Sequence, residues 1–219
     1  DGQHRDRLET TYLEIAKRSD NTVKPILAAM TDGGSTDKLL SMLGRVGGEA
    51  ALAKIDEALA SEKADRKAAG VRALCNWPDA AVADRLAALA KGGDQPATRV
   101  SSLRAYIRVI SLESDRPESE TRKMLQAAYK LAERPEERVL AVKRISTVRD
   151  METLRWLVSL LDAEAPVAQE ACRSIVDLAH HRFLRNPNRD EFNNALNRVL
   201  ETSKDPETVD RAKGYLEGV

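Results

Sequence analysis

A short helical pattern recurs along the chain, and this repetition limits the possible folds more than any other feature. Each copy has a basic residue, then any residue, then a large apolar residue. The copies are Arg72-Ala73-Leu74, Arg104-Ala105-Tyr106, Lys143-Arg144-Ile145, Arg173-Ser174-Ile175 and Lys213-Gly214-Tyr215. An earlier copy, Ser41-Met42-Leu43, fits the pattern in everything but the charge. They follow one another at intervals of 30 to 40 residues, which is the period of many helical repeat proteins. We therefore expect one amphipathic helix, the pattern helix, to be reused, with insertions near residues 113–118 and 182–190.

Four prolines mark the beginnings of these pattern helices. Pro96, Pro135, Pro166 and Pro206 each come shortly before a copy of the pattern. Proline is favoured in the first helical turn, where its missing N–H would have no partner. The segments between the copies are amphipathic as well. They predict partner helices over residues 49–61, 80–91, 119–133, 151–164 and 191–204.

Composition favours an all-α fold. Aromatic residues make up 4% of the 219 residues, which is low for a β-sheet protein, and no segment shows the sustained alternation of a strand. Residues 1–20 predict a further amphipathic helix that either caps the array or is half of another repeat. Short turns favour antiparallel neighbours, so we expect residues 1–219 to form a single domain of about five to six antiparallel helix pairs.

Paired helices with this period resemble the HEAT-type α-solenoid, and the resemblance covers residues 21–219. It implies a right-handed α-α superhelix of the armadillo type, whose concave surface binds partners. Many HEAT repeats carry a basic residue in the second helix, and this residue is present here. They also carry an acidic residue in the turn, whose position varies here among Asp65, Asp94, Glu136, Asp162 and Asp205.

Two segments resemble a narrower group of proteins. Residues 43–52 and 72–80 are similar to HEAT segments of multidomain, often exported bacterial proteins that also carry a 3-keto-disaccharide-hydrolase-like domain. This resemblance implies that the chain is the helical module and that any chemistry lies in another domain. The chain begins with Asp1 rather than methionine, so we expect it to be a fragment of a longer chain. The sequence predicts no particular cellular compartment.

The concave surface of such a solenoid is lined by the second helix of each pair. On a pattern helix, Val71 and Leu74 share the buried face, whereas Ala73 and Asn76 point most nearly away from it. The small residues Ala105 and Ser174 occupy the position of Ala73 in later copies. The candidate binding residues on this concave face are Asn76, Arg108, Arg144, Thr147 and Asp177.

A basic column flanks the buried face, and it has two interpretations. It consists of Arg72, Arg104, Lys143, Arg173 and Lys213. It could bind a polyanion, or it could be a structural ladder that pairs turn carboxylates or helix-end carbonyls between adjacent layers. We favour the ladder because the column lies beside the core. On this interpretation Arg104 is structural and Arg108 faces the open surface.

Several kinds of chemistry find no support in the sequence. Thirty-five Lys and Arg residues balance 35 Asp and Glu residues, so no general attraction to nucleic acid is expected. His180 and His181 are adjacent and cannot easily share a metal ion on a helix. Cys75 and Cys172 lie in separate apolar helices, and we expect them to be free thiols that do not pair. No catalytic residue, metal ligand or cofactor site is predicted.

The sequence favours a non-catalytic protein-interaction or scaffold module. Its expected partner is another protein or another domain of the parent chain, and no segment is apolar enough to span a membrane. The alternative is a nucleic-acid-binding HEAT protein of the DNA-glycosylase-like kind, which would use concave Trp and Asp residues. Trp77 and Trp156 are better explained as packing residues, and the residues expected on the concave face do not form a basic stripe. A third possibility is an enzyme of unassigned class.

Overall fold

The computed structural model describes residues 23–31 and 36–218. Helices dominate these residues, and no strand occurs among them. The predicted all-α fold class is therefore confirmed for the described part of the chain. The helix expected over residues 1–20 lies outside it. The helices group into two compact units, one ending at Leu112 and the other beginning at Glu113.

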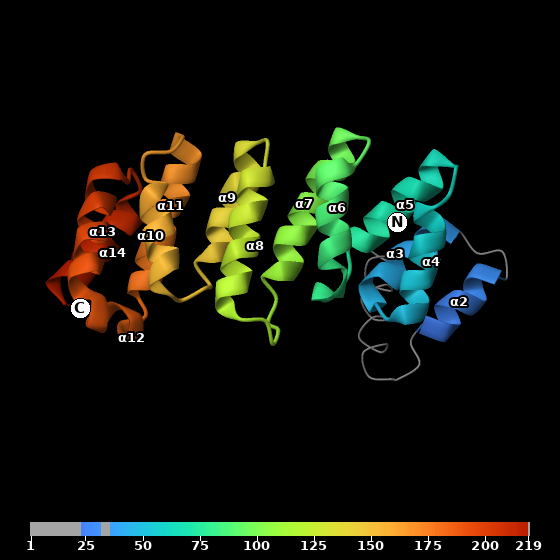
Figure 1. The fold of residues 1–219 in the computed structure, drawn as a ribbon, viewed down its shortest axis with the longest axis horizontal. Coiled ribbons are helices and arrows are strands. Elements are labelled where there is room, and N and C mark those ends of the chain that lie inside the picture. The colour runs from blue at the N-terminus through green and yellow to red at the C-terminus, as the bar shows by residue number, and fades with distance from the viewer. Residues whose placement is uncertain (1–22, 32–35, 219) are drawn as a thin grey trace. The chain divides into compact units, whose positions relative to one another are not determined.

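In its described part, the first unit contains two partner helices and three pattern helices, preceded by a short helix (Figure 1). Its elements are α2 (Val23–Thr31), α3 (Thr36–Val46), α4 (Glu49–Leu59), α5 (Ala64–Cys75), the 3₁₀ helix η1 (Ala80–Val82), α6 (Ala83–Gly92) and α7 (Pro96–Ile110). The pattern helices α3, α5 and α7 pack in sequence order, and α4 and α6 cover α5 and α7 respectively.

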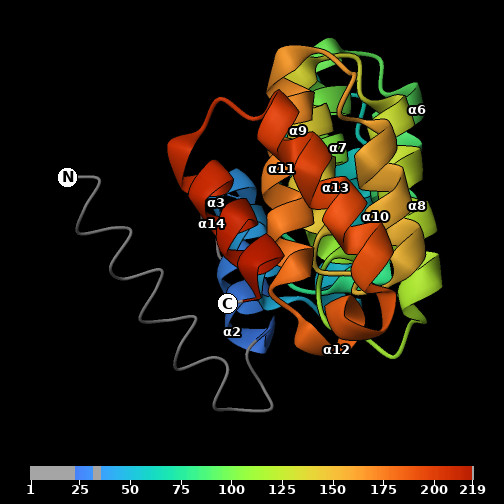
Figure 2. The same ribbon diagram turned by 90° about the vertical axis from the view of Figure 1, so that its left-hand side faces the viewer.

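The second unit repeats this arrangement and adds one insertion. Its elements are α8 (Glu118–Leu131), α9 (Pro135–Ile145), α10 (Met151–Ser159), α11 (Ala165–Ala179), α12 (Arg182–Arg185), the 3₁₀ helix η2 (Asn186–Asn188), α13 (Arg189–Thr202) and α14 (Pro206–Glu217). The pattern helices α9, α11 and α14 pack in sequence order, and each contacts its partner helix α8, α10 or α13. Within this unit, Figure 2 shows α9 and α11 on one side and α8 and α10 on the other.

Local sequence signals explain several helix ends. Pro96, Pro135 and Pro206 are the first residues of their helices, where a missing N–H costs nothing. Helix α10 begins at Met151 as predicted, because the side chain of Asp150 accepts a hydrogen bond from the Thr153 backbone N–H at 2.7 Å. These signals determine where each helix starts, and burial determines how the helices stack.

Arginine side chains close two of the turns between partner and pattern helices. Arg99 donates to the carbonyl of Gly93 at 3.0 Å, and Arg138 donates to the carbonyl of Ala132 at 3.2 Å. Each arginine follows the proline that begins its helix by three positions. It thereby satisfies a carbonyl at the end of the preceding helix, which has no partner inside that helix.

Polar contacts also join successive helix pairs within each unit, and we call them cross-layer bonds. They connect residues that are 26 to 36 positions apart in the pairs Arg138–Glu164, Lys67–Asp94, Arg122–Asp150, Arg85–Asp56, Arg173–Asp205, Arg211–Asp177 and Arg155–Glu191. Most of these side chains are partly exposed, so each pair stabilises the fold only slightly. Their sequence separations overlap the 30- to 40-residue intervals of the sequence pattern.

Candidate functional site

The predicted concave-face residues are divided between the two units. Asn76 follows the end of α5 and is exposed, as are Arg144 and Thr147 at the end of α9. Asp177 of α11 is exposed and accepts a hydrogen bond from Arg211 at 3.0 Å. Within the second unit, Arg144, Thr147 and Asp177 are therefore accessible to a partner.

Arg108 departs from the predicted open position. It is half-buried in α7, and its Nη2 donates to the carbonyls of Trp77 at 2.6 Å and Cys75 at 3.2 Å. Burial lowers the pKa of its guanidinium. The helical wheel gives only the direction of Cβ, whereas the long side chain reaches back to cap α5. Arg108 therefore connects layers, the role that the sequence assigned to Arg104.

The small residues expected on the open face are buried instead. Ala73, Ala105 and Ser174 are 0%, 6% and 1% exposed, and Ser174 donates its hydroxyl to the carbonyl of Val142 on the preceding pattern helix at 3.2 Å. An ideal Cβ on Gly44 would lie 2.1 Å from the carbonyl oxygen of Ala73. The small residues Gly44, Ala73, Ala105 and Ser174 allow successive pattern helices to approach closely. These residues therefore form packing contacts rather than a binding surface.

All five residues of the flanking basic column are exposed. They are Arg72, Arg104, Lys143, Arg173 and Lys213. Arg173 shows the geometry of the structural ladder, because its Nε lies 3.4 Å from the carboxylate of Asp205 in the turn of the next helix pair. The assignment of the whole column to this role stays a prediction.

Replacing Arg108 with alanine is expected to lower the free energy of unfolding by about 1–3 kcal/mol, because two partly buried carbonyls would lose a charged donor. The matched control is Lys91→Ala in α6, which removes an exposed basic side chain outside the basic column and should change stability by less than about 0.5 kcal/mol. Urea denaturation followed by circular dichroism measures both. Equal losses in the two variants would contradict the capping role of Arg108.

Cys75 and Cys172 are both free thiols. Cys172 is 0% exposed, and burial raises its pKa to about 11. Burial also raises the pKa of the half-buried Cys75. Since the thiolate is the reactive form, we expect both residues to react slowly with a thiol reagent at pH 8 in the folded protein. Rapid labelling of Cys172 before unfolding would contradict this expectation.

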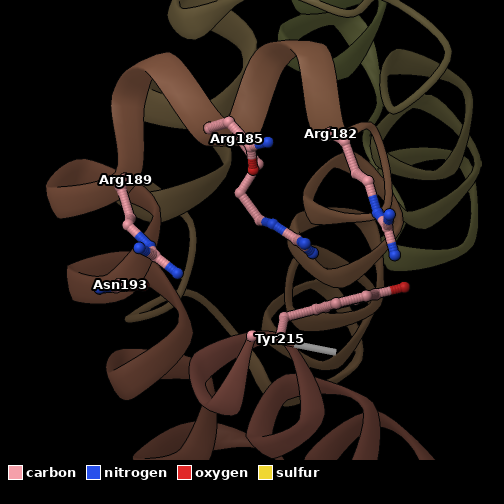
Figure 3. Close-up of a pocket in the computed structure, with 7 residues that line it drawn as sticks. Arg182, Arg185, Arg189, Asn193 and Tyr215 are labelled. Atoms are coloured by element: carbon pink, nitrogen blue, oxygen red, sulfur yellow. The ribbon is translucent and has the colours of Figure 1, made fainter.

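A pocket in the second unit is a candidate site. We call it the arginine pocket, and its volume is about 210 Å³. Its walls come from α12, η2, the start of α13 and the end of α14, and in Figure 3 Arg182, Arg185 and Arg189 extend toward the space beside Tyr215. The lining residues are Arg182, Arg185, Asn186, Arg189, Asn193, Tyr215 and Gly218.

A second cavity adjoins the arginine pocket, and we call it the tyrosine chamber. It shares Arg182, Arg185 and Tyr215 with the pocket, and its volume is about 300 Å³. Apolar surface dominates its walls, whereas polar surface dominates the walls of the arginine pocket. The complete lining of the chamber is His180, Arg182, Arg185, Arg211, Gly214 and Tyr215.

Tyr215 is held in position from two sides. The guanidinium carbon of Arg185 lies 4.7 Å from the centre of the tyrosine ring, a cation–π geometry. The hydroxyl of Tyr215 lies 3.2 Å from Nδ1 of His180. Arg185 is itself only 8% exposed and donates to the carbonyl of Ala179 at 2.9 Å. The wall between the two cavities is therefore well ordered before any ligand binds.

The sequence contains a signal for this pocket that is separate from the repeat pattern. Arg182, Arg185, Arg189 and Asn193 are separated by three, four and four residues, the spacing of one helix face. They lie at the second predicted insertion and just after it. The sequence pattern predicts only an insertion there, and the structure forms α12 and η2 in it.

Other site classes receive no support from the described residues. No three His, Cys, Asp or Glu side chains among them gather as a metal-binding group. In the same part of the chain, no helix combines the length and the apolar character needed to cross a bilayer. No protein-family model matches the chain, and a comparison with curated proteins gives no significant match.

Proposed function

We propose that this chain is a non-catalytic protein-interaction or scaffold module built from HEAT-like repeats. In this proposal the helix pairs continue as a right-handed solenoid of about five to six pairs. The module belongs to a larger multidomain bacterial protein, and its partner is another protein or another domain of the parent chain.

The observation that carries the proposal is the regular spacing of the cross-layer bonds. Residues 26 to 36 positions apart meet repeatedly within each unit, and successive pattern helices pack on one another. In a repeat protein each helix pair contacts its neighbours, and the array offers an extended surface to partners. The exposed side chains of Arg144, Thr147 and Asp177 are the candidate contact residues on this surface.

Site-specific photo-crosslinking in the cells that produce the protein tests the proposal. A photoreactive amino acid is placed at Arg144 or Thr147 on the pattern-helix side, and at Lys123 or Lys130 on α8 as matched controls. All four positions are exposed. We expect a discrete protein adduct from the first two positions and none from the controls.

Two results would overturn the proposal. Identical adduct patterns at all four positions would show that the candidate surface has no specific partner. Adducts with nucleic acid alone would favour the glycosylase-like alternative. That alternative also requires salt-sensitive binding to DNA of random sequence, which the balanced charge of the chain does not favour.

A further inference from the structure

The arginine pocket holds positive charge that no carboxylate among the described residues balances by an ion pair. Arginines elsewhere in the second unit bridge helices by pairing with acids, as Arg155 does with Glu191 and Arg198 does with Asp162. In contrast, Arg182, Arg185 and Arg189 form no ion pair among the residues that the structure describes. Like charges in one pocket repel each other, so an anionic ligand would bind there favourably.

Arg185 is the central group of this pocket. Its side chain is buried against Tyr215, and one of its N–H groups is donated to the carbonyl of Ala179. A guanidinium has five N–H donors in a rigid plane. The remaining donors can therefore meet a ligand without the entropy loss of ordering a flexible side chain.

The donors of the pocket suit a phosphate group. Three guanidinium groups more than balance the two negative charges of a phosphate dianion and can each donate two hydrogen bonds to its oxygens. Asn186 and Asn193 add neutral amide donors to the lining. The adjoining tyrosine chamber offers apolar surface to whatever group carries the phosphate.

We propose that the arginine pocket binds the phosphate group of an organic phosphate monoester, with the organic part in the tyrosine chamber. This binding is separate from the protein-interaction surface proposed above, and its test uses a small ligand. Either proposal can therefore fail without the other.

Isothermal titration calorimetry with phenyl phosphate at low ionic strength tests the proposal on the whole chain. We expect saturable binding that weakens as salt is added. Inorganic phosphate lacks the organic part and should bind at least about tenfold more weakly. Benzoate carries an aromatic ring but only a single charge, and it should also bind more weakly than phenyl phosphate.

Arg189→Gln is the variant to use, because Arg189 is exposed and lines the pocket without bracing the fold. We expect it to weaken the binding of phenyl phosphate about tenfold or more, since a charged hydrogen-bond donor is lost. Lys130→Gln removes the same charge from α8, which contributes no lining residue, and should leave the affinity unchanged. Circular dichroism checks that both variants are folded.

A peptide that contains phosphotyrosine presents the same phenyl phosphate group on a peptide chain. Its affinity, compared with that of phenyl phosphate, distinguishes a phosphorylated protein from a small phosphate ester as the ligand. Tighter binding of the peptide than of phenyl phosphate would assign the site to a phosphorylated protein, and equal binding would assign it to a small phosphate ester. The absence of saturable binding to either ligand would overturn the proposal, as would equal affinity in the wild type and Arg189→Gln. Benzoate binding as tightly as phenyl phosphate would assign the pocket to carboxylates instead.

Discussion

Gly44→Ala is expected to lower the free energy of unfolding by about 2 kcal/mol. A Cβ at this position would lie 2.1 Å from the carbonyl oxygen of Ala73 and 2.7 Å from its carbonyl carbon. Both are backbone atoms of α5, which can move only if the packing of α3 and α5 changes. Added volume in a tightly packed contact costs about 1–3 kcal/mol and sometimes more. The gain in helix propensity from glycine to alanine, about 1 kcal/mol, offsets only part of this cost.

Gly92→Ala is the matched control for Gly44→Ala. Gly92 is the last residue of α6, and no atom lies within 4 Å of an added Cβ. We expect this change to be neutral or to stabilise the protein by about 0.5 kcal/mol, through helix propensity and reduced freedom of the unfolded chain. Chemical denaturation compares the two variants. A loss of less than about 1 kcal/mol in Gly44→Ala would mean that α3 and α5 can separate easily.

Phe192→Ala is expected to lower the free energy of unfolding of the second unit by about 3–5 kcal/mol, the usual range for removing a buried aromatic side chain. Phe192 is 0% exposed in α13. Because the two units are compact in themselves, the loss should be larger in the second unit than in the first.

The two tryptophans provide separate probes for this comparison. Trp77 lies in the first unit at 2% exposure, and Trp156 lies in the second unit with its ring 5.4 Å from that of Tyr129. In a Trp156→Phe background Trp77 reports the first unit, and in a Trp77→Phe background Trp156 reports the second. We expect Phe192→Ala to shift the denaturation midpoint of Trp156 fluorescence more strongly. Equal shifts of both probes would show that the two units unfold together.

Helix positions could be predicted from the sequence because their signals are local. The partner helices α4 and α10 begin at Glu49 and Met151, the residues given by periodicity and turn signals. The pattern helices α7, α9 and α14 begin at prolines for the reason already given. Such signals depend on neighbouring residues only, so one sequence is sufficient to find them.

The exposed faces could not be predicted in the same way. Amphipathic periodicity identifies one buried face, but a pattern helix contacts its partner helix and also the pattern helices before and after it. Ala73 is therefore buried although it points away from Leu74 on the helical wheel. Arg108 and Arg185 show a related limit, because the position of a long side chain depends on which carbonyl lies within its reach.

The short sequence range of the cross-layer bonds has a consequence for folding during synthesis. None of the hydrogen bonds described above joins residues more than 36 positions apart, and the turn bonds of Arg99 and Arg138 span six. Contacts between residues close in sequence form quickly because little loop entropy is lost. A helix pair that leaves the ribosome can therefore fold by packing against the helix pair that was synthesised just before it. The nascent chain can bury its apolar surface stepwise, with little exposed to aggregation at any time.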